Sequence, residues 1–229
     1  WVIQIKSYGA YAAKPKAEIE YKDGQHPLIS LNGPAGSKIC YTTDGSTPTN
    51  KSALYAKPFT VPVTSVVKAI AVKPGQLSSG IVESKVKVYL PMKAQVVGKT
   101  ATGLQYKYVE AADLTTDKVI AAPATKAGIT PTFNTAVKER TDKYGLVFTG
   151  YFQQDKESMV EFFTSSDDGS LLYIDDELIV DNNGSHGMEE RAGKAFLAMG
   201  WHSIKVVYYD GGGGNGLKVS YKAEGGEKK

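Results

Sequence analysis

Hydrophobic and polar residues alternate along most of the chain, and no window of useful length has a helical period. In the first half the alternation is clear at 17–21 and 82–88, whereas 38–43 and 65–73 are more continuously apolar. Alternation with period two predicts half-buried strands, and short continuous apolar runs predict fully buried ones. Turn-forming pairs separate these segments: Asp23-Gly24, Gly33-Pro34, Asp44-Gly45 and Pro74-Gly75. Their close spacing predicts a small antiparallel sandwich over 14–90, after a leader segment at 1–13.

The pattern lapses in a polar stretch at 91–102, where we place a linker between two domains. Alternation resumes at Leu104 and continues to about Tyr221, with a longer irregular stretch at 111–141. Residues 103–229 therefore form a second domain that is also built from strands. The sequence predicts an all-β fold with two antiparallel β-sandwich domains.

Composition and charge exclude several classes of protein. The 229 residues are 41% hydrophobic and 22% charged, and no long apolar run is present, which argues against a disordered chain and against a membrane span. The net charge of +3 comes from 27 basic and 24 acidic residues without clustering, so nucleic acid is not an expected partner. With one cysteine and three histidines, the chain offers neither an internal disulfide nor a zinc site.

The segment from Ile39 to Thr49, which reads ICYTTDGSTPT, is the most distinctive motif of the first half. Physically it is a buried strand followed by a tight Asp-Gly turn and a Ser/Thr/Pro corner. Together with Leu54-Tyr55 and Pro58-Phe59 it resembles the C-terminal immunoglobulin-like domain of chitobiases and β-hexosaminidases. The resemblance implies an immunoglobulin-like module that accompanies a catalytic barrel and carries no chemistry of its own.

Several motifs in the second half occur in the order of another family. They are Tyr144-Gly145-Leu146, Gly150-Tyr151, the run from Ser165 to Asp175, the run from Asp181 to Gly187, and Gly200-Trp201-His202-Ser203-Ile204. In this order they resemble the fourteen-kilodalton domain first named in anthrax protective antigen. The resemblance implies a jelly-roll-like β-sandwich of the kind found in glycosidases and yeast adhesins.

Asp167 and Asp168 are the principal candidates for chemistry. Neighbouring residues of a strand point to opposite faces, so a shared ligand would require the backbone to bend, for example through a cis peptide bond. The resemblance to the adhesins implies that such a doublet binds calcium, which accepts six to eight oxygen ligands in flexible geometry. An ordinary turn at Asp167-Asp168-Gly169 is the alternative.

The same resemblance points to ligands outside the doublet. Asp210 ends a strand that in the adhesins ends at an asparagine ligand, and the glycine run after it can direct the carbonyls of Gly212 and Gly214 toward the same ion. Carbohydrate contact is assigned to Asp167, Asp168, His186 and Asn215. The loop after Asp210 is short and rich in glycine, so we expect weak and broad sugar selectivity.

Other polar residues have simpler interpretations. Asp175-Asp176-Glu177 should close a hairpin with its charges in water, and His186 should be a loop histidine bonded to nearby backbone. His202 is expected to pack in the core. No pair of carboxylates stands in a glycosidase motif, so we expect no catalytic activity in this segment.

Taken together, the sequence predicts a non-catalytic accessory region of a secreted or periplasmic glycoside hydrolase, β-hexosaminidase-like, that binds calcium and carbohydrate. The chain begins with Trp1, so we expect that it was processed or belongs to a longer protein with an N-terminal catalytic domain. Two alternatives stay open: a purely structural or oligomerising pair of domains, and a calcium-dependent cell-surface adhesin.

Overall fold

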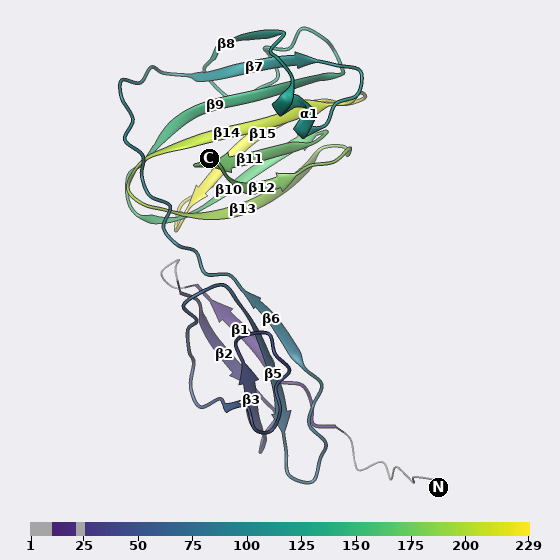
Figure 1. The fold of residues 1–229 in the computed structure, drawn as a ribbon, viewed down its shortest axis with the longest axis vertical. Helices are drawn as coiled ribbons and strands as arrows, with labels where there is room; N and C mark the ends of the chain where they lie inside the picture. The colour runs from purple at the N-terminus through teal and green to yellow at the C-terminus, as the bar shows by residue number, and fades with distance from the viewer. Residues whose placement is uncertain (1–10, 22–25) are drawn as a thin grey trace. The chain divides into compact units, whose positions relative to one another are not determined.

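A computed structural model describes residues 11–21 and 26–229 and divides the chain into two compact units between Leu90 and Pro91 (Figure 1). Both units are built almost entirely from antiparallel strands, which confirms the all-β prediction. The predicted Asp23-Gly24 turn and the first ten residues of the predicted leader lie outside the described residues. No helix of the described part is long and apolar enough to cross a membrane.

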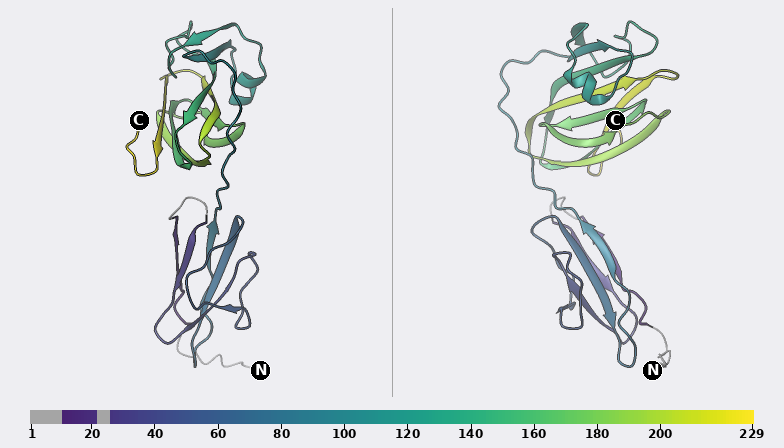
Figure 2. Two further views of the ribbon diagram at one scale, coloured as in Figure 1. Left: turned by 90° about the vertical axis from the view of Figure 1, so that its left-hand side faces the viewer. Right: turned by 45° about the vertical axis from the view of Figure 1, so that its right-hand side comes forward.

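Unit 1 packs a two-stranded sheet and a four-stranded sheet around one core (Figure 2). The first sheet pairs β1 with β2, and the second has the order β4-β3-β5-β6. The apolar runs expected to be fully buried strands correspond to β3 and β5, which carry Ile39, Val67 and Ala69 in the core. The strands are β1 Lys16–Glu20, β2 Leu28–Asn32, β3 Lys38–Thr42, β4 Ala53–Leu54, β5 Ser65–Val72 and β6 Val82–Val86.

Unit 2 consists of a six-stranded sheet in the order β12-β11-β14-β9-β7-β8 and a three-stranded sheet in the order β13-β10-β15. Its strands are β7 Leu104–Glu110, β8 Lys126–Thr130, β9 Tyr144–Gln154, β10 Ser158–Asp167, β11 Ser170–Ile174, β12 Glu177–Asn182, β13 Glu189–Leu197, β14 Gly200–Asp210 and β15 Gly216–Ala223. Five connections pass between the two sheets: β9 to β10, β10 to β11, β12 to β13, β13 to β14, and β14 to β15.

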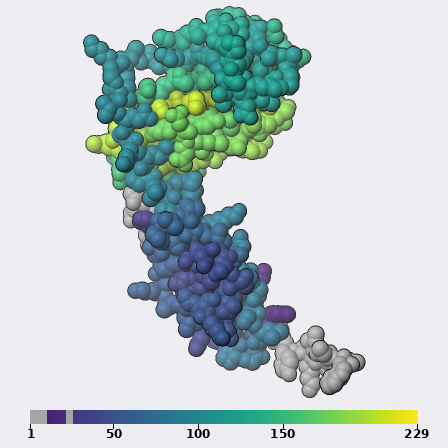
Figure 3. All heavy atoms as spheres, viewed as in Figure 1, coloured from purple at the N-terminus to yellow at the C-terminus, as the bar shows by residue number. Residues whose placement is uncertain are grey.

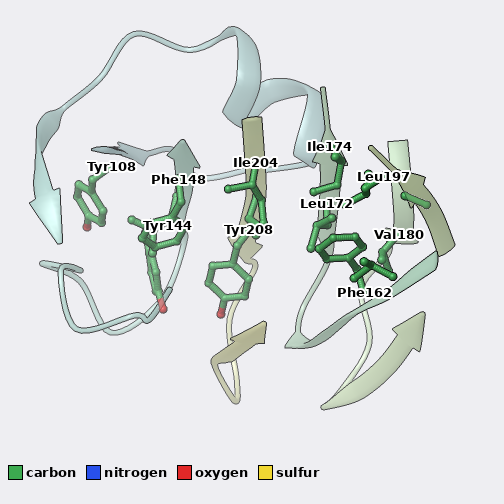
Figure 4. Packing of buried hydrophobic residues seen from close by; sticks show 14 residues of the cluster. Tyr108, Tyr144, Phe148, Phe162, Leu172, Ile174, Val180, Leu197, Ile204 and Tyr208 are labelled. Atoms are coloured by element: carbon green, nitrogen blue, oxygen red, sulfur yellow. The ribbon is translucent and has the colours of Figure 1, made fainter. Parts of the chain in front are cut away.

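The core of unit 2 lies between these sheets and follows the period-two pattern of the sequence. On β14 the inward positions are Ile204, Val206 and Tyr208, and on β10 they begin with Val160 and Phe162. Figure 4 shows the aromatic rings in one part of this cluster, with Phe162 among the aliphatic side chains in the other part. Burial of this continuous apolar layer is the main source of stability for the unit.

One short helix was not predicted. Helix α1, Thr116–Ala121, lies within the irregular stretch and begins at Thr115, whose hydroxyl accepts a hydrogen bond from the backbone N–H of Lys118. Six residues are too few to show a helical period, which explains why the sequence pattern missed it. The helix buries Val119 against Gly145, where a Cβ atom would overlap the valine side chain.

The beginning of the predicted linker pairs with unit 2. Met92 donates its backbone N–H to Phe196 O at 2.8 Å, and Gln95 donates to Trp201 O at 2.8 Å. The side chain of Gln95 also donates to Asp175 Oδ1 at 2.6 Å. Residues 92–95 are therefore held against β13 and β14.

Gly193 provides a test of the packing between β12 and β13. A Cβ atom at this position would overlap the carbonyl oxygen of Ile179, which is backbone and has little freedom to move. We expect Gly193→Ala to lower the free energy of unfolding by about 3 kcal/mol or more, measured by denaturant titration. Gly98→Ala is the matched control, because a Cβ there meets nothing within 4 Å. An equal, small effect of both substitutions would contradict the close approach.

Candidate metal and carbohydrate site

The predicted site residues lie where the chain crosses between the two sheets of unit 2 (Figure 1). Asp168 and Gly169 connect β10 to β11, residues 183–188 connect β12 to β13, and residues 211–215 connect β14 to β15. Because each crossing leaves one sheet and enters the other, the sandwich core ends here. The alternation of the strands therefore brings inward-facing residues of several segments together.

Asp168 lies on one of these crossings, and its carboxylate binds the other two. Oδ1 accepts hydrogen bonds from Ser185 Oγ at 2.8 Å and from the backbone N–H of His186 at 3.1 Å. Oδ2 accepts from the backbone N–H of Gly211 at 2.8 Å. The residue is 4% exposed, so these three donors replace most of the water that a carboxylate would otherwise bind.

Asp167 is oriented differently and is less buried. The peptide bond between Asp167 and Asp168 is cis. The carbonyl oxygen of Asp167 accepts a hydrogen bond from the Tyr208 hydroxyl at 2.6 Å. Its carboxylate lies over Gly214, where a Cβ atom would stand 2.5 Å from Oδ2. Gly214 therefore leaves room for this carboxylate beside the 211–215 loop.

Asp210 occupies an inward position at the end of β14, two residues after the core residue Tyr208 and opposite Tyr144 of β9. It is fully buried. Oδ1 accepts the backbone N–H of Gly212 at 2.7 Å, whereas Oδ2 has no hydrogen-bond partner. Burial, together with the nearby Asp168 charge, raises the pKa of Asp210 above 3.8. The Gly212 hydrogen bond and Lys138 lower this pKa by less than burial raises it.

The core is polar around this end of the sandwich. Inward positions of β10, β11 and β12 carry buried hydroxyls and an amide: Thr164, Ser166, Ser170 and Asn182. Ser166 and Ser170 share a hydrogen bond of 2.8 Å, and Asn182 Nδ2 donates to Ser166 Oγ at 3.1 Å. We call this group, with Asp168 and Asp210, the polar end. In this group, polar side chains replace the apolar ones that fill the rest of the core.

His186 and Asn215, assigned to carbohydrate, have their side chains bonded within the protein. The His186 ring contacts the carbonyl oxygens of Gly187 at 2.8 Å and Asn182 at 3.2 Å, which confirms the interpretation as a loop histidine bonded to backbone. Partial burial lowers its pKa, but the two carbonyls and the Glu189 charge raise it, and the net shift is upward. Asn215 accepts from Lys138 Nζ at 2.6 Å. Only the backbone of His186 therefore reaches Asp168.

Two of the three predicted carboxylates are buried and keep an acceptor position free. Asp168 has about one free acceptor position after its three hydrogen bonds, on Oδ2, and Asp210 Oδ2 is entirely free. Among residues 11–21 and 26–229, no three Asp, Glu, His or Cys side chains form a group that could hold a metal. The predicted convergence of all three carboxylates is therefore not found. The donor set is two buried carboxylates, with Asp167 nearby over Gly214.

Asp175 and His202 form a second, largely buried pair, and the prediction for Asp175 is wrong. Asp175 and Asp176 do make the two-residue turn between β11 and β12, with φ of 47° and 65°. The Asp175 carboxylate is not in water, however. It lies 2.6 Å from His202 Nδ1 and accepts the backbone N–H of Ser203 at 2.8 Å. His202 is fully buried as predicted, and its Nε2 contacts Ala198 O at 2.9 Å, so the pair has a structural role.

Some contributors to the site left no signal in the sequence. Ser185 and the N–H of Gly211 bond to Asp168 through segments far apart in the chain, and Lys138 reaches Asn215 from the irregular stretch. The inward position of Asp210 could have been found. It continues the Ile204, Val206, Tyr208 series, which places a carboxylate on the core face.

Two family models match the chain. Residues 15–84 match the chitobiase/beta-hexosaminidase C-terminal domain, and residues 101–229 match the PA14 domain. The chain belongs to the PA14 domain family. Both resemblances and their order are thereby confirmed, and unit 2 is called the PA14 unit below. No curated protein matches the chain.

Several solved structures are similar to this chain at low sequence identity. A PA14 sugar-binding domain from an RTX adhesin is 19% identical with a TM-score of 0.50, covering 57% of this chain and 94% of that one. A beta-glucosidase from Kluyveromyces marxianus in complex with glucose is 19% identical with a TM-score of 0.43. That match covers 53% of this chain but only 15% of the beta-glucosidase. An anti-sigma factor domain-containing protein from Clostridium clariflavum is 14% identical with a TM-score of 0.46, covering 96% and 78%.

The unpartnered Asp210 oxygen predicts an unusual pH dependence in the presence of a chelator. Because the folded pKa is raised, the folded state binds a proton more tightly than the unfolded state, and stability falls as pH rises from about 4 through the raised value. Asp210→Asn removes this buried charge. We expect it to raise the free energy of unfolding by about 1 to 3 kcal/mol at neutral pH, with the difference vanishing toward about pH 4. Denaturant titrations across this range measure the effect.

The matched control is Asp155→Asn, in the exposed turn between β9 and β10. It should leave stability unchanged at every pH within about 0.5 kcal/mol. If Asp210→Asn destabilises the chelated protein at neutral pH, the carboxylate is compensated and the argument for a free buried oxygen fails.

Proposed function

We propose that the chain is a non-catalytic, carbohydrate-binding accessory region of a secreted or periplasmic glycoside hydrolase, in which the PA14 unit binds calcium with Asp168 and Asp210. The Asp167 carboxylate lies over Gly214, outside this pair. Backbone carbonyls of Gly212 and Gly214 are the further candidate ligands. Bound calcium would supply open coordination positions at which sugar hydroxyls can replace water.

The observation that supports this proposal best is the free Oδ2 of Asp210 beside a second buried carboxylate. An isolated buried carboxylate is unfavourable because it loses its water without gaining a partner. A divalent cation would provide that partner and would offset the repulsion between Asp168 and Asp210. Calcium suits the site better than magnesium, because calcium tolerates irregular sets of carboxylate, carbonyl and water ligands.

The carbohydrate role is supported by the PA14 family match and by the similarity to the PA14 sugar-binding domain of an RTX adhesin. Near the acidic pair, the 211–215 loop consists of four glycines and Asn215, whose side chain is bonded to Lys138. Few side chains there are available to distinguish one sugar from another. The PA14 unit therefore binds glycans weakly and broadly at this end.

The link to a glycoside hydrolase is supported by the match of unit 1 to the chitobiase/beta-hexosaminidase C-terminal domain. Both matched domains are of the accessory type. The partner would be an N-terminal catalytic domain of the same protein, β-hexosaminidase-like in activity, acting outside the cell or in the cell envelope. The two units would hold that domain near polymeric substrate or shape its cleft.

Calcium should stabilise the PA14 unit through this site. At a concentration about 100 times the dissociation constant, a ligand of the folded state adds about 2.7 kcal/mol, which corresponds to a rise in Tm of roughly 10 °C. Asp210→Asn should abolish the rise, and Asp155→Asn should retain it. Calorimetry in calcium, in magnesium and in chelator measures this directly. An unchanged Tm in the wild-type protein would rule out the calcium site.

Glycan binding at this end should depend on calcium. We expect a glycan array to show weak binding to several sugars with calcium, and a loss of about ten-fold or more in affinity with Asp210→Asn. Asp155→Asn should bind as the wild-type protein does. Strong binding to a single terminal sugar would instead favour an adhesin, and no binding to any glycan would favour a purely structural role.

A further inference from the structure

The outer face of the six-stranded sheet is covered over only part of its area. Helix α1 and its neighbours bury Val109, Val147 and Val207 on this face. The outward residues nearer the start of β14 are left uncovered. They form the floor of a groove of about 840 Å³, which is in the range of sites that hold small ligands.

Adjacent strands contribute the floor of this groove in register. One row of the floor consists of Lys205 on β14, Thr149 on β9 and Gln105 on β7, which stand opposite one another. In the next row, Ser203 on β14 stands opposite Tyr151 on β9. Trp201 follows on β14, diagonal to Tyr151 on the same face. The floor thus alternates aromatic rings with hydroxyl and amide groups.

One wall is made by residues 95–103, which we call the strap. Figure 3 shows this part of the chain along the left edge of the PA14 unit. Its first residue is fixed to the floor: Gln95 pairs with the backbone of Trp201 and donates to Asp175 Oδ1. Asp175 in turn holds Ser203 and the buried His202. The carboxylate of Asp175, which is largely buried, therefore connects the start of the strap to the floor. Because these hydrogen bonds are made within the protein, this end of the groove exists before a ligand binds.

The charge and polarity of the groove indicate its ligand. Lys205 Nζ lies 3.4 Å from Asp176 Oδ1, so the two charges largely cancel, and Lys99 is the remaining charged residue of the lining. Tyr151 is 50% exposed. An aromatic ring with a negative face packs against the C–H groups of a sugar ring, while hydroxyls and amides hydrogen-bond its rim. A neutral oligosaccharide has this combination of surfaces, and Lys99 is the single positive charge of the lining that Asp176 does not offset, which is little for a strongly anionic ligand.

We propose that this groove is a second glycan-binding site, for a neutral oligosaccharide, and that it works without calcium. The groove contains neither Asp168 nor Asp210, the proposed calcium ligands. Trp201 and Asp210 are nine residues apart on one continuous strand, which is about 30 Å at 3.3 Å per residue. Binding in the groove therefore does not rest on the calcium site of the proposed function, and the two can fail separately.

The test uses Trp201 as its own reporter. The sequence has two tryptophans, so Trp1→Phe leaves Trp201 as the source of tryptophan fluorescence. Titration with chitohexaose and with cellohexaose in excess chelator should change this fluorescence saturably for at least one of them. Tyr151→Ala should then weaken binding by about ten-fold.

Tyr221→Ala is the matched control, because Tyr221 is similarly exposed, at 44%, but lies on the other sheet. It should bind as the parent does, and so should Asp210→Asn. The proposal is overturned if neither sugar changes the fluorescence, if chelator abolishes binding, or if Tyr151→Ala and Tyr221→Ala have equal effects. A fluorescence change that depends on protein concentration without sugar would identify a second copy of the chain as the occupant and would also overturn it.

Discussion

The architecture of the PA14 unit at its polar end depends on the carboxylate of Asp168. Three separate crossings between the sheets meet there, and a single side chain accepts hydrogen bonds from Ser185, His186 and Gly211. A carboxylate is suited to this task, because it offers about four acceptor positions and no competing donor. Hydrogen bonds to a charged acceptor are also stronger than those between neutral groups. The loops around the site are therefore held without regular secondary structure.

At the same end of the core, buried polar side chains take the place of apolar ones. Along β10 the inward residues change from Val160 and Phe162 to Thr164 and Ser166 as the strand approaches this end. The neighbouring sheet ends here with Asp210 of β14. The Ser166 hydroxyl finds partners, but Thr164 Oγ1, Asn182 Oδ1 and the charged Asp210 Oδ2 do not. Burial of such a group opposes folding. The residues that lower the stability of the free unit are thus the residues best placed to bind a cation.

Much of the fold could be predicted because period-two alternation depends on local sequence and on which face meets the core. The strands followed from this pattern, whereas the interest in Asp167-Asp168 came from the family resemblance. The partners of Asp168 could not be predicted, since Ser185 and Gly211 approach it only after the sheets stack. The prediction that the Asp175 carboxylate lies in water was wrong for a similar reason. The groups that bury it, Gln95 and His202, come from distant segments of the chain. The groove depends on the path of the strap, which carries no alternation of its own.

β14 is an unbroken strand of eleven residues, with Trp201 near its beginning and Asp210 at its end. Hydrogen bonds to β9 along its whole length keep the spacing between these residues constant. A short glycan can occupy one end only, whereas a polymer that spans the distance can occupy both at once. The second contact is then intramolecular and raises overall avidity without any new interaction. Strand length would in this way favour long polysaccharide chains over the short products of their degradation.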